Sequence, residues 1–155
     1  MQKSKPDYYN DLDKTYSKIW DLLKKGLLNR NSPFHIPVFI SCINNKTDGR
    51  IVVLRGVDEK NKKLWFHSDI RSNKIKTLKD NSKSNFLFYD KEEKIQLKIF
   101  VTSKIQYNNS TTKKAWGKTA HMSRQCYLGN QPPGKESSKP TSGLTEDIDN
   151  SKYTI

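Results

Sequence analysis

The chain has 155 residues, enough for one domain with a buried core, and its 10% aromatic content argues against disorder throughout. Its 29 Lys and Arg against 16 Asp and Glu give a formal charge of +13, which favours anionic partners such as nucleic acid, a phosphorylated cofactor or an acidic membrane surface. No stretch is long enough to span a membrane, and no secretory signal is found, so a cytoplasmic protein without a disulfide framework is predicted.

The first half of the chain predicts a helix followed by antiparallel strands. Residues 1–10 are polar and are expected to be disordered. Residues 11–28 carry apolar side chains at helical spacing, with Gly26 near the end of the predicted helix and Pro33 beyond it. Alternation and turn residues then predict strands at 38–43, 50–57 and 64–68, with turns at 44–49 and 58–63.

In the second half, Ser72 is expected to cap a short helix with Ile75, Leu78 and Lys79 on its inner side. Strands are predicted at 86–89 and 95–107, and a second helix from Ser110 or Thr111 to Met122. Residues 129–155 have too few apolar side chains for a core of their own.

These elements predict a mainly β (α+β) fold: a split, Greek-key type β-barrel of about six antiparallel strands, with an N-terminal helix and short connecting helices. The chain is expected to divide into a disordered N-terminus (residues 1–10), one folded domain (residues 11–128) and a polar, loop-like tail (residues 129–155).

Most catalytic signatures are absent from the sequence. There is no P-loop, no GxGxxG and no GxSxG pattern, and the three histidines are scattered without ligand spacing, so no metal site is expected. Cys42 is interpreted as a small buried hydrophobe. No residue is assigned a catalytic role.

A cluster of potential anion ligands lies between residues 50 and 74. The segment LWFHSDIRSNKIKTL (residues 64–78) predicts a strand ending at Ser68, then a helix beginning at Ser72 and Lys74. A helix start with a hydroxyl and cations can hold a phosphate, although each residue alone is more often a solvated surface group. Arg50 and Arg55 are five residues apart, so they can meet one ligand only if the strand bends or the ligand lies at a barrel edge or between subunits.

The same region carries a longer pattern: Arg-x-Val-x-Leu-Arg, then Asp, a strand ending in Ser, Ser-x-Lys, a Leu and Asn spacer, and Gln in a later strand. The residues that fit it are Arg50, Val52, Leu54, Arg55, Asp58, Ser68, Ser72, Lys74, Leu78, Asn81 and Gln96. In this pattern the chain resembles the FMN-binding core of the pyridoxamine 5′-phosphate oxidase family. Residues 115–134, with Ser142-Gly143-Leu144, resemble its cyanobacterial-type branch, and the similarity runs from about Trp20 to Leu144.

The resemblance implies a split β-barrel, a homodimer with FMN at its interface, and FMN-dependent oxidation of a small molecule such as a pyridoxine phosphate. Arg50 and Lys74 would neutralise the FMN phosphate with help from Ser72 and Asn73, and Val52, Val53, Leu54 and Arg55 would run along the flavin. The remaining cofactor ligands implied are His67, Ser68, Gln96, Arg124 and, near it, Ser123.

The chain departs from the family in three places. Asn73 stands where the oxidases have Arg, His67 replaces a Tyr, and the sequence stops at Ile155, before the family's last strands. An inactive, C-terminally short member is therefore one alternative. The other is a basic β-barrel that binds single-stranded nucleic acid through Trp65, Phe66, Phe88 and Tyr89, for which core packing is the preferred interpretation.

Overall fold

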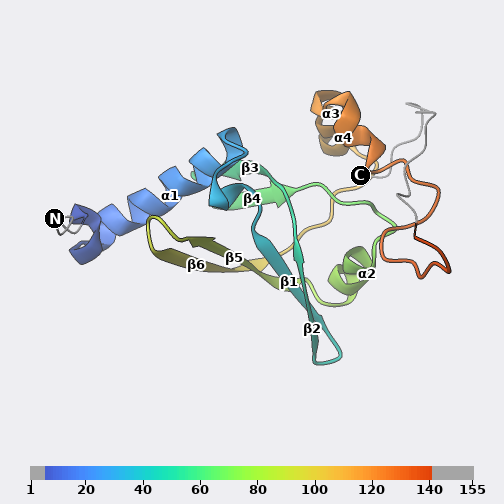
Figure 1. The fold of residues 1–155 in the computed structure, drawn as a ribbon, viewed down its shortest axis with the longest axis horizontal. Helices are drawn as coiled ribbons and strands as arrows, with labels where there is room; N and C mark the ends of the chain where they lie inside the picture. The colour runs from blue at the N-terminus through green and yellow to red at the C-terminus, as the bar shows by residue number, and fades with distance from the viewer. Residues whose placement is uncertain (1–5, 141–155) are drawn as a thin grey trace. The chain divides into compact units, whose positions relative to one another are not determined.

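Within residues 6–140, which are the residues that the computed structural model describes, six strands form two sheets (Figure 1). The larger sheet has the order β2-β1-β5-β6 and the smaller pairs β3 with β4. The strands are β1 (Val38–Ile43), β2 (Lys46–Ile51), β3 (Leu54–Asp58), β4 (Lys63–Phe66), β5 (Lys83–Asp90) and β6 (Ile95–Thr102). The prediction of a mainly β fold of about six strands is confirmed.

Helices precede, separate and follow these strands. They are η1 (Asp7–Asn10), α1 (Leu12–Leu28), η2 (Pro33–His35), α2 (Asn73–Asp80), α3 (Ser110–Lys118) and α4 (His121–Gln125). The helix predicted for residues 11–28 is confirmed, and its N-cap Asp11 accepts hydrogen bonds from the backbone N–H groups of Asp13 and Lys14. None of the helices in residues 6–140 has the length and hydrophobicity that a bilayer crossing requires.

The chain forms two compact units, which are considered separately below. The first unit contains residues 6–40, 49–66 and 85–101, and the second contains residues 41–48, 67–84 and 102–140. Each unit takes in segments that are distant in the sequence.

Phenylalanine rings pack together in the core of the first unit. Phe39 packs against Phe66 and Phe86 with ring centroids 4.8 and 5.2 Å apart, and Phe34 stacks on Phe88 at 5.0 Å. Core packing is thus confirmed for Phe66 and Phe88. The prediction of core packing is wrong for the other two aromatic residues, since Trp65 is 47% exposed and Tyr89 is 59% exposed.

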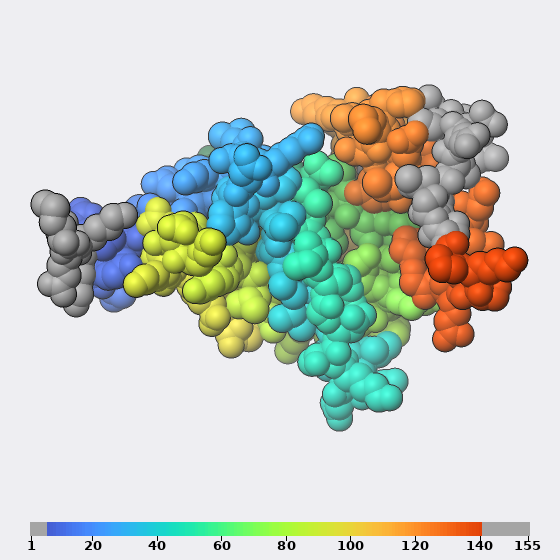
Figure 2. All heavy atoms as spheres, viewed as in Figure 1, coloured from blue at the N-terminus to red at the C-terminus, as the bar shows by residue number. Residues whose placement is uncertain are grey.

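The N-terminal segment is attached to the turn between β5 and β6. Residues Asp7–Asn10, inside the segment expected to be disordered, form η1. Tyr8 donates a hydrogen bond from its hydroxyl to Glu93 at 2.7 Å, and Lys18 of α1 pairs with the same carboxylate at 2.9 Å. Figure 2 shows the yellow atoms of this turn against the blue atoms of η1 and α1.

The predicted turn at 44–49 and strand at 50–57 are wrong in their boundaries. Asn44 and Asn45 both adopt positive φ, so the turn needs only two residues and β2 begins at Lys46. The polar residues of β2 are almost all exposed and give no alternating pattern. The strand then breaks where Val52 donates its backbone N–H to Pro37 O at 3.0 Å.

The predictions for the later elements also need correction. The strand expected to reach residue 107 ends at Thr102, because its neighbour β5 begins only at Lys83. The single helix expected up to Met122 is divided into α3 and α4 by Thr119, whose backbone is extended. On α2, Thr77 is buried, whereas Lys79, expected on the inner side, is exposed.

Candidate functional site

Two serine hydroxyls and one ammonium group meet at the start of α2, in the second unit. Ser68 Oγ lies 3.1 Å from Ser72 Oγ. Lys74 Nζ donates to Ser68 Oγ at 3.1 Å and to Ser72 Oγ at 3.3 Å. We call Ser68, Ser72 and Lys74 the hydroxyl–lysine cluster. The three residues were predicted from sequence to share one anion site, and the structure brings them together.

Ser72 occupies the N-cap position of α2, as expected, but its side chain does not cap the helix. Its hydroxyl points instead to Ser68 and Lys74. The first N–H groups of a helix have no partner within the helix, and the helix dipole makes this end positive. The cluster therefore combines a cation, two hydroxyls and a helix N-terminus, which is the donor set that a phosphate group takes.

The loop before α2 is folded by Asp69. Its backbone carbonyl accepts from Ser72 N at 3.0 Å and from Ser68 Oγ at 3.3 Å. Its carboxylate, whose side chain is only 3% exposed, accepts from Arg71 Nε at 3.0 Å and from Arg71 Nη2 at 2.6 Å. The hydrogen bonds that Arg71 donates to this carboxylate raise the pKa of Arg71, which stays charged. These contacts of Asp69 depend on the loop conformation and could not be predicted from the sequence.

The C-terminal end of α2 is held by the Asn of the sequence pattern. Asn81 donates from Nδ2 to Cys42 O at 3.1 Å, which ties the end of the helix to β1. Leu78 and Ile75 of α2 are buried. Lys74 and Asn81 of the sequence pattern therefore mark the two ends of α2, the helix whose start lies at the hydroxyl–lysine cluster.

Asn73, the first residue of α2, is exposed. A turn from the later part of the chain lies beside it: a Cβ built on Gly134, whose φ is +81°, would lie 3.9 Å from Asn73 Nδ2. Lys135 N closes this turn on Pro132 O at 3.3 Å. This segment is part of the predicted loop-like tail. The glycine that follows two prolines is a sequence signal for the turn found here.

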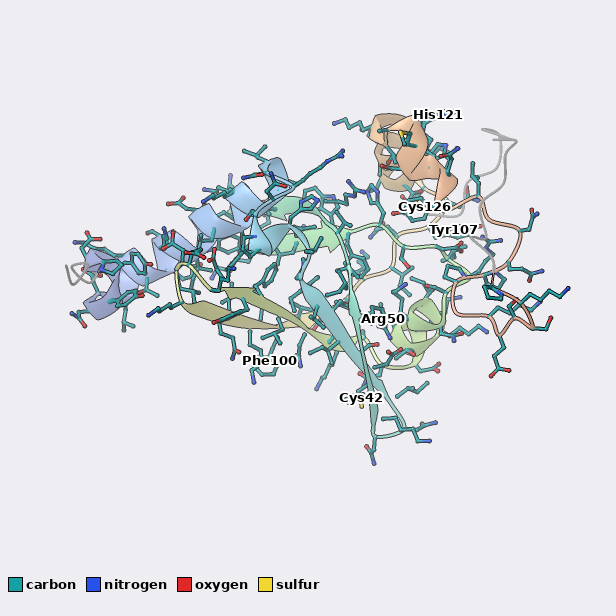
Figure 3. The ribbon with its side chains drawn as sticks, viewed as in Figure 1. Cys42, Arg50, Phe100, Tyr107, His121 and Cys126 are labelled. Carbon is teal, nitrogen blue, oxygen red and sulfur yellow. The ribbon has the colours of Figure 1, made fainter. Side chains whose placement is uncertain are left out.

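The predicted flavin-lining residues belong to the first unit. Arg50 is on β2 (Figure 3), and the strand break after Ile51 interrupts the chain between Arg50 and Arg55. No regular strand therefore runs from one arginine to the other, which is consistent with the first of the three arrangements considered for these residues. Val52 is 7% exposed and Leu54 1% exposed, whereas Val53 and Arg55 are half-buried.

Arg55 carries a polar atom that protein groups leave unsatisfied. Among the described residues, its buried Nε has no hydrogen-bond acceptor. A buried N–H without a partner costs free energy, so such atoms often mark the place of a ligand. The family resemblance implies that Arg55 runs along the flavin, and a carbonyl oxygen there would satisfy Nε.

Three further predicted ligands are placed as follows. Arg124 donates from Nε to Thr119 O at 3.0 Å and lies over the ring of Trp116, 5.3 Å from its centroid, so it joins α4 to α3. Gln96 is exposed on β6. His67 is half-buried and directly precedes the cluster.

No group of three or more His, Cys, Asp or Glu side chains within residues 6–140 is placed to hold a metal ion. Cys42 on β1 and Cys126 after α4 are free thiols (Figure 3).

Comparison with known proteins gives the family. Residues 18–106 match the model of the pyridoxamine 5′-phosphate oxidase FMN-binding domain, more than half of the chain, and the chain belongs to this family. A comparison with curated proteins finds no match.

Solved structures share the fold. One is a pyridoxamine 5′-phosphate oxidase-related, FMN-binding protein from Nostoc punctiforme (TM-score 0.65, 18% identity), with 82% of this chain and 68% of that chain covered. Another is PhzG from Burkholderia lata, solved with tetrahydrophenazine-1-carboxylic acid (TM-score 0.63, 17% identity), with 86% and 66% covered. This chain thus spans about two thirds of each neighbour, and its fold is the split barrel of this family.

Proposed function

We propose that this chain binds FMN and is an FMN-dependent oxidoreductase of the pyridoxamine 5′-phosphate oxidase type. The observation that carries the proposal is the hydroxyl–lysine cluster at the start of α2, within a domain of an FMN-binding family. A dianionic phosphate fits a cluster of one ammonium, two hydroxyls and a helix N-terminus, because each supplies a donor or positive charge.

The sequence pattern supplies further proposed ligands. Arg50 adds a second cation for the phosphate, and Asn73 adds an amide at the first position of α2. Val52, Val53, Leu54 and Arg55 follow the flavin, and the unsatisfied Nε of Arg55 supports a hydrogen bond from this residue to a ring carbonyl. His67, Gln96 and Arg124 complete the proposed set.

When bound, FMN supplies hydride chemistry, and the protein's own residues bind, orient and shield it. Lys74, Ser68 and Ser72 hold the charged end, and the apolar side chains of Val52 and Leu54 exclude water. No acid or base in the chain is required for these tasks. The proposed substrate is a small molecule of the pyridoxine phosphate class, oxidised in the cytoplasm.

We also propose that the chain forms a homodimer with FMN at the interface. The outward side of the larger sheet supports it: Ile51, Tyr89 and Phe100 are 60%, 59% and 73% exposed. Figure 3 shows Phe100 on β6 directed away from the sheet. Large apolar side chains exposed on several strands of one sheet are a feature of interaction surfaces.

The test is a visible absorption spectrum of the purified chain after FMN is added and the excess removed. Flavin bands are expected in the wild type and in Lys76→Ala, which removes an exposed cation on the same helix. The bands should fade in Lys74→Ala, because losing a charge-assisted contact to phosphate costs about 1.5–3 kcal/mol. A colourless wild type, or equal bands in both variants, contradicts the proposal.

A further inference from the structure

The geometry assigns to Asp69 and Arg71 the role of positioning residues for the phosphate site, an inference that rests on the proposed function. Arg71 stands between Ser68 and Ser72 in the sequence, among the cations of the anion-binding segment, and it would be expected to bind the anion itself. In the structure its guanidinium is bound to Asp69 instead, through Nε to both carboxylate oxygens at 3.0 and 3.2 Å and through Nη2 at 2.6 Å.

The pair fixes the backbone that carries the two hydroxyls. Arg71 also donates its backbone N–H to the Asp69 carboxylate at 2.8 Å, so one buried side chain holds both the backbone and the guanidinium of Arg71. The Asp69 carbonyl accepts from Ser72 N and from Ser68 Oγ. Because Ser68 and Ser72 are held to the same residue, their hydroxyls stay 3.1 Å apart before any ligand arrives. Such preorganisation lowers the entropy cost of binding.

The pair has an electrostatic role as well. A carboxylate so close in sequence to a phosphate site would repel the ligand if its charge were not neutralised. Arg71 neutralises it with a forked contact, and Asp69 in turn holds the arginine in place. Removing either partner therefore disturbs the site: without Asp69 the loop loses its anchor, and without Arg71 a buried negative charge is left uncompensated.

The experiment compares the affinities of the full chain for FMN and for riboflavin, which lacks the phosphate, in Asp69→Asn and Arg71→Gln. A general loss of folding lowers both affinities, whereas a disturbed phosphate site lowers only that for FMN. We expect Asp69→Asn to lose about tenfold in FMN affinity and Arg71→Gln more than that. Riboflavin affinity should stay within about twofold, and Arg71→Lys, which keeps the charge, should recover part of the loss.

Asp58→Asn is the matched control, since Asp58 makes the same kind of turn contacts, to Asn61 N at 3.0 Å and Asn61 Nδ2 at 2.7 Å, in the first unit. It should leave the ratio of the two affinities unchanged. Wild-type protein that binds FMN and riboflavin equally overturns the phosphate site and this inference with it. Wild-type discrimination that persists in Asp69→Asn and Arg71→Gln overturns the positioning role alone.

Discussion

The indole of Trp65 covers Gly56 so closely that a Cβ at position 56 would lie 1.8 Å from the ring. The two residues face each other across β3 and β4, where the register shifts between Leu54 and Gly56. Gly56→Ala should therefore force the ring or the strand to move, at a cost of about 1–3 kcal/mol in the free energy of unfolding. Denaturant unfolding monitored by tryptophan fluorescence measures it.

The control for this substitution is Gly117→Ala. Gly117 is in the last turn of α3 and has no atom within 4 Å of the position of its Cβ. Alanine there should stabilise the protein by about 0.5–1 kcal/mol, because glycine is the poorer helix former. If both substitutions shift the unfolding midpoint in the same direction, the close packing of Trp65 on Gly56 does not limit stability.

Glu93 should make stability depend on pH at the acid end. Hydrogen bonds from Lys18 and then Tyr8 lower the pKa of Glu93 below its ordinary value of 4.5. The stabilisation is thus present above pH 4.5 and is lost as the pH falls through the lower, folded-state pKa. Glu93→Gln should cost about 1 kcal/mol at pH 7, and the difference from wild type should shrink towards pH 3.

Glu92→Gln is the comparison for Glu93, because Glu92 is 83% exposed and lies 4.0 Å from Lys91. Its thermal unfolding should follow the wild type at every pH.

Burial, and then the hydrogen bond to Glu93, raise the pKa of Tyr8 to about 12. An ultraviolet titration in which Tyr8→Phe removes no high-pH ionisation speaks against this contact.

Ser72→Ala should weaken FMN binding without unfolding the chain. The hydroxyl of Ser72 contacts Ser68 and Lys74 rather than capping α2, so its loss removes a phosphate donor and leaves the helix start unchanged. We expect a loss of about 1 kcal/mol in binding, measured by fluorescence titration of FMN. Ser84→Ala, which removes another buried hydroxyl bonded to a serine, should bind like the wild type.

Arg55→Met should separate ligand binding from folding. The buried Nε has no acceptor in the described residues, so the apo protein should lose little stability when the guanidinium is replaced by an apolar chain of similar length. The increase in melting temperature caused by saturating FMN should become smaller in the variant. A variant with an unchanged increase would show that Arg55 does not meet the cofactor.

Phe100→Glu tests the homodimer. A charge at this 73% exposed position on the edge strand β6 should prevent association because burying it is costly, and light scattering after gel filtration should report a monomer. Leu12→Glu, at an 87% exposed position on α1, should leave the wild-type mass unchanged. Identical masses for wild type and Phe100→Glu would exclude this face as the interface.

Local sequence determined much of this protein. The apolar spacing of residues 11–28, the alternation in β6 and the position of Ser72 predicted the helix, the strand and the start of α2, because each signal acts within one element. The spacing from Arg50 to Gln96 predicted the family, which the comparison confirms.

Tertiary structure decided what depends on pairs distant in sequence or on loop conformation. Nothing in the sequence shows that Trp65 packs on Gly56, that Glu93 accepts a hydrogen bond from Tyr8, or that Arg71 pairs with Asp69. Where several charged residues are close in sequence, the distance between two charges and their burial decide which of them form a pair. Both quantities are set only when the chain has folded. The sequence therefore predicted Lys74 as a cation of the proposed phosphate site, and the fold shows that Lys74 meets the two hydroxyls whereas Arg71 binds Asp69 within the loop.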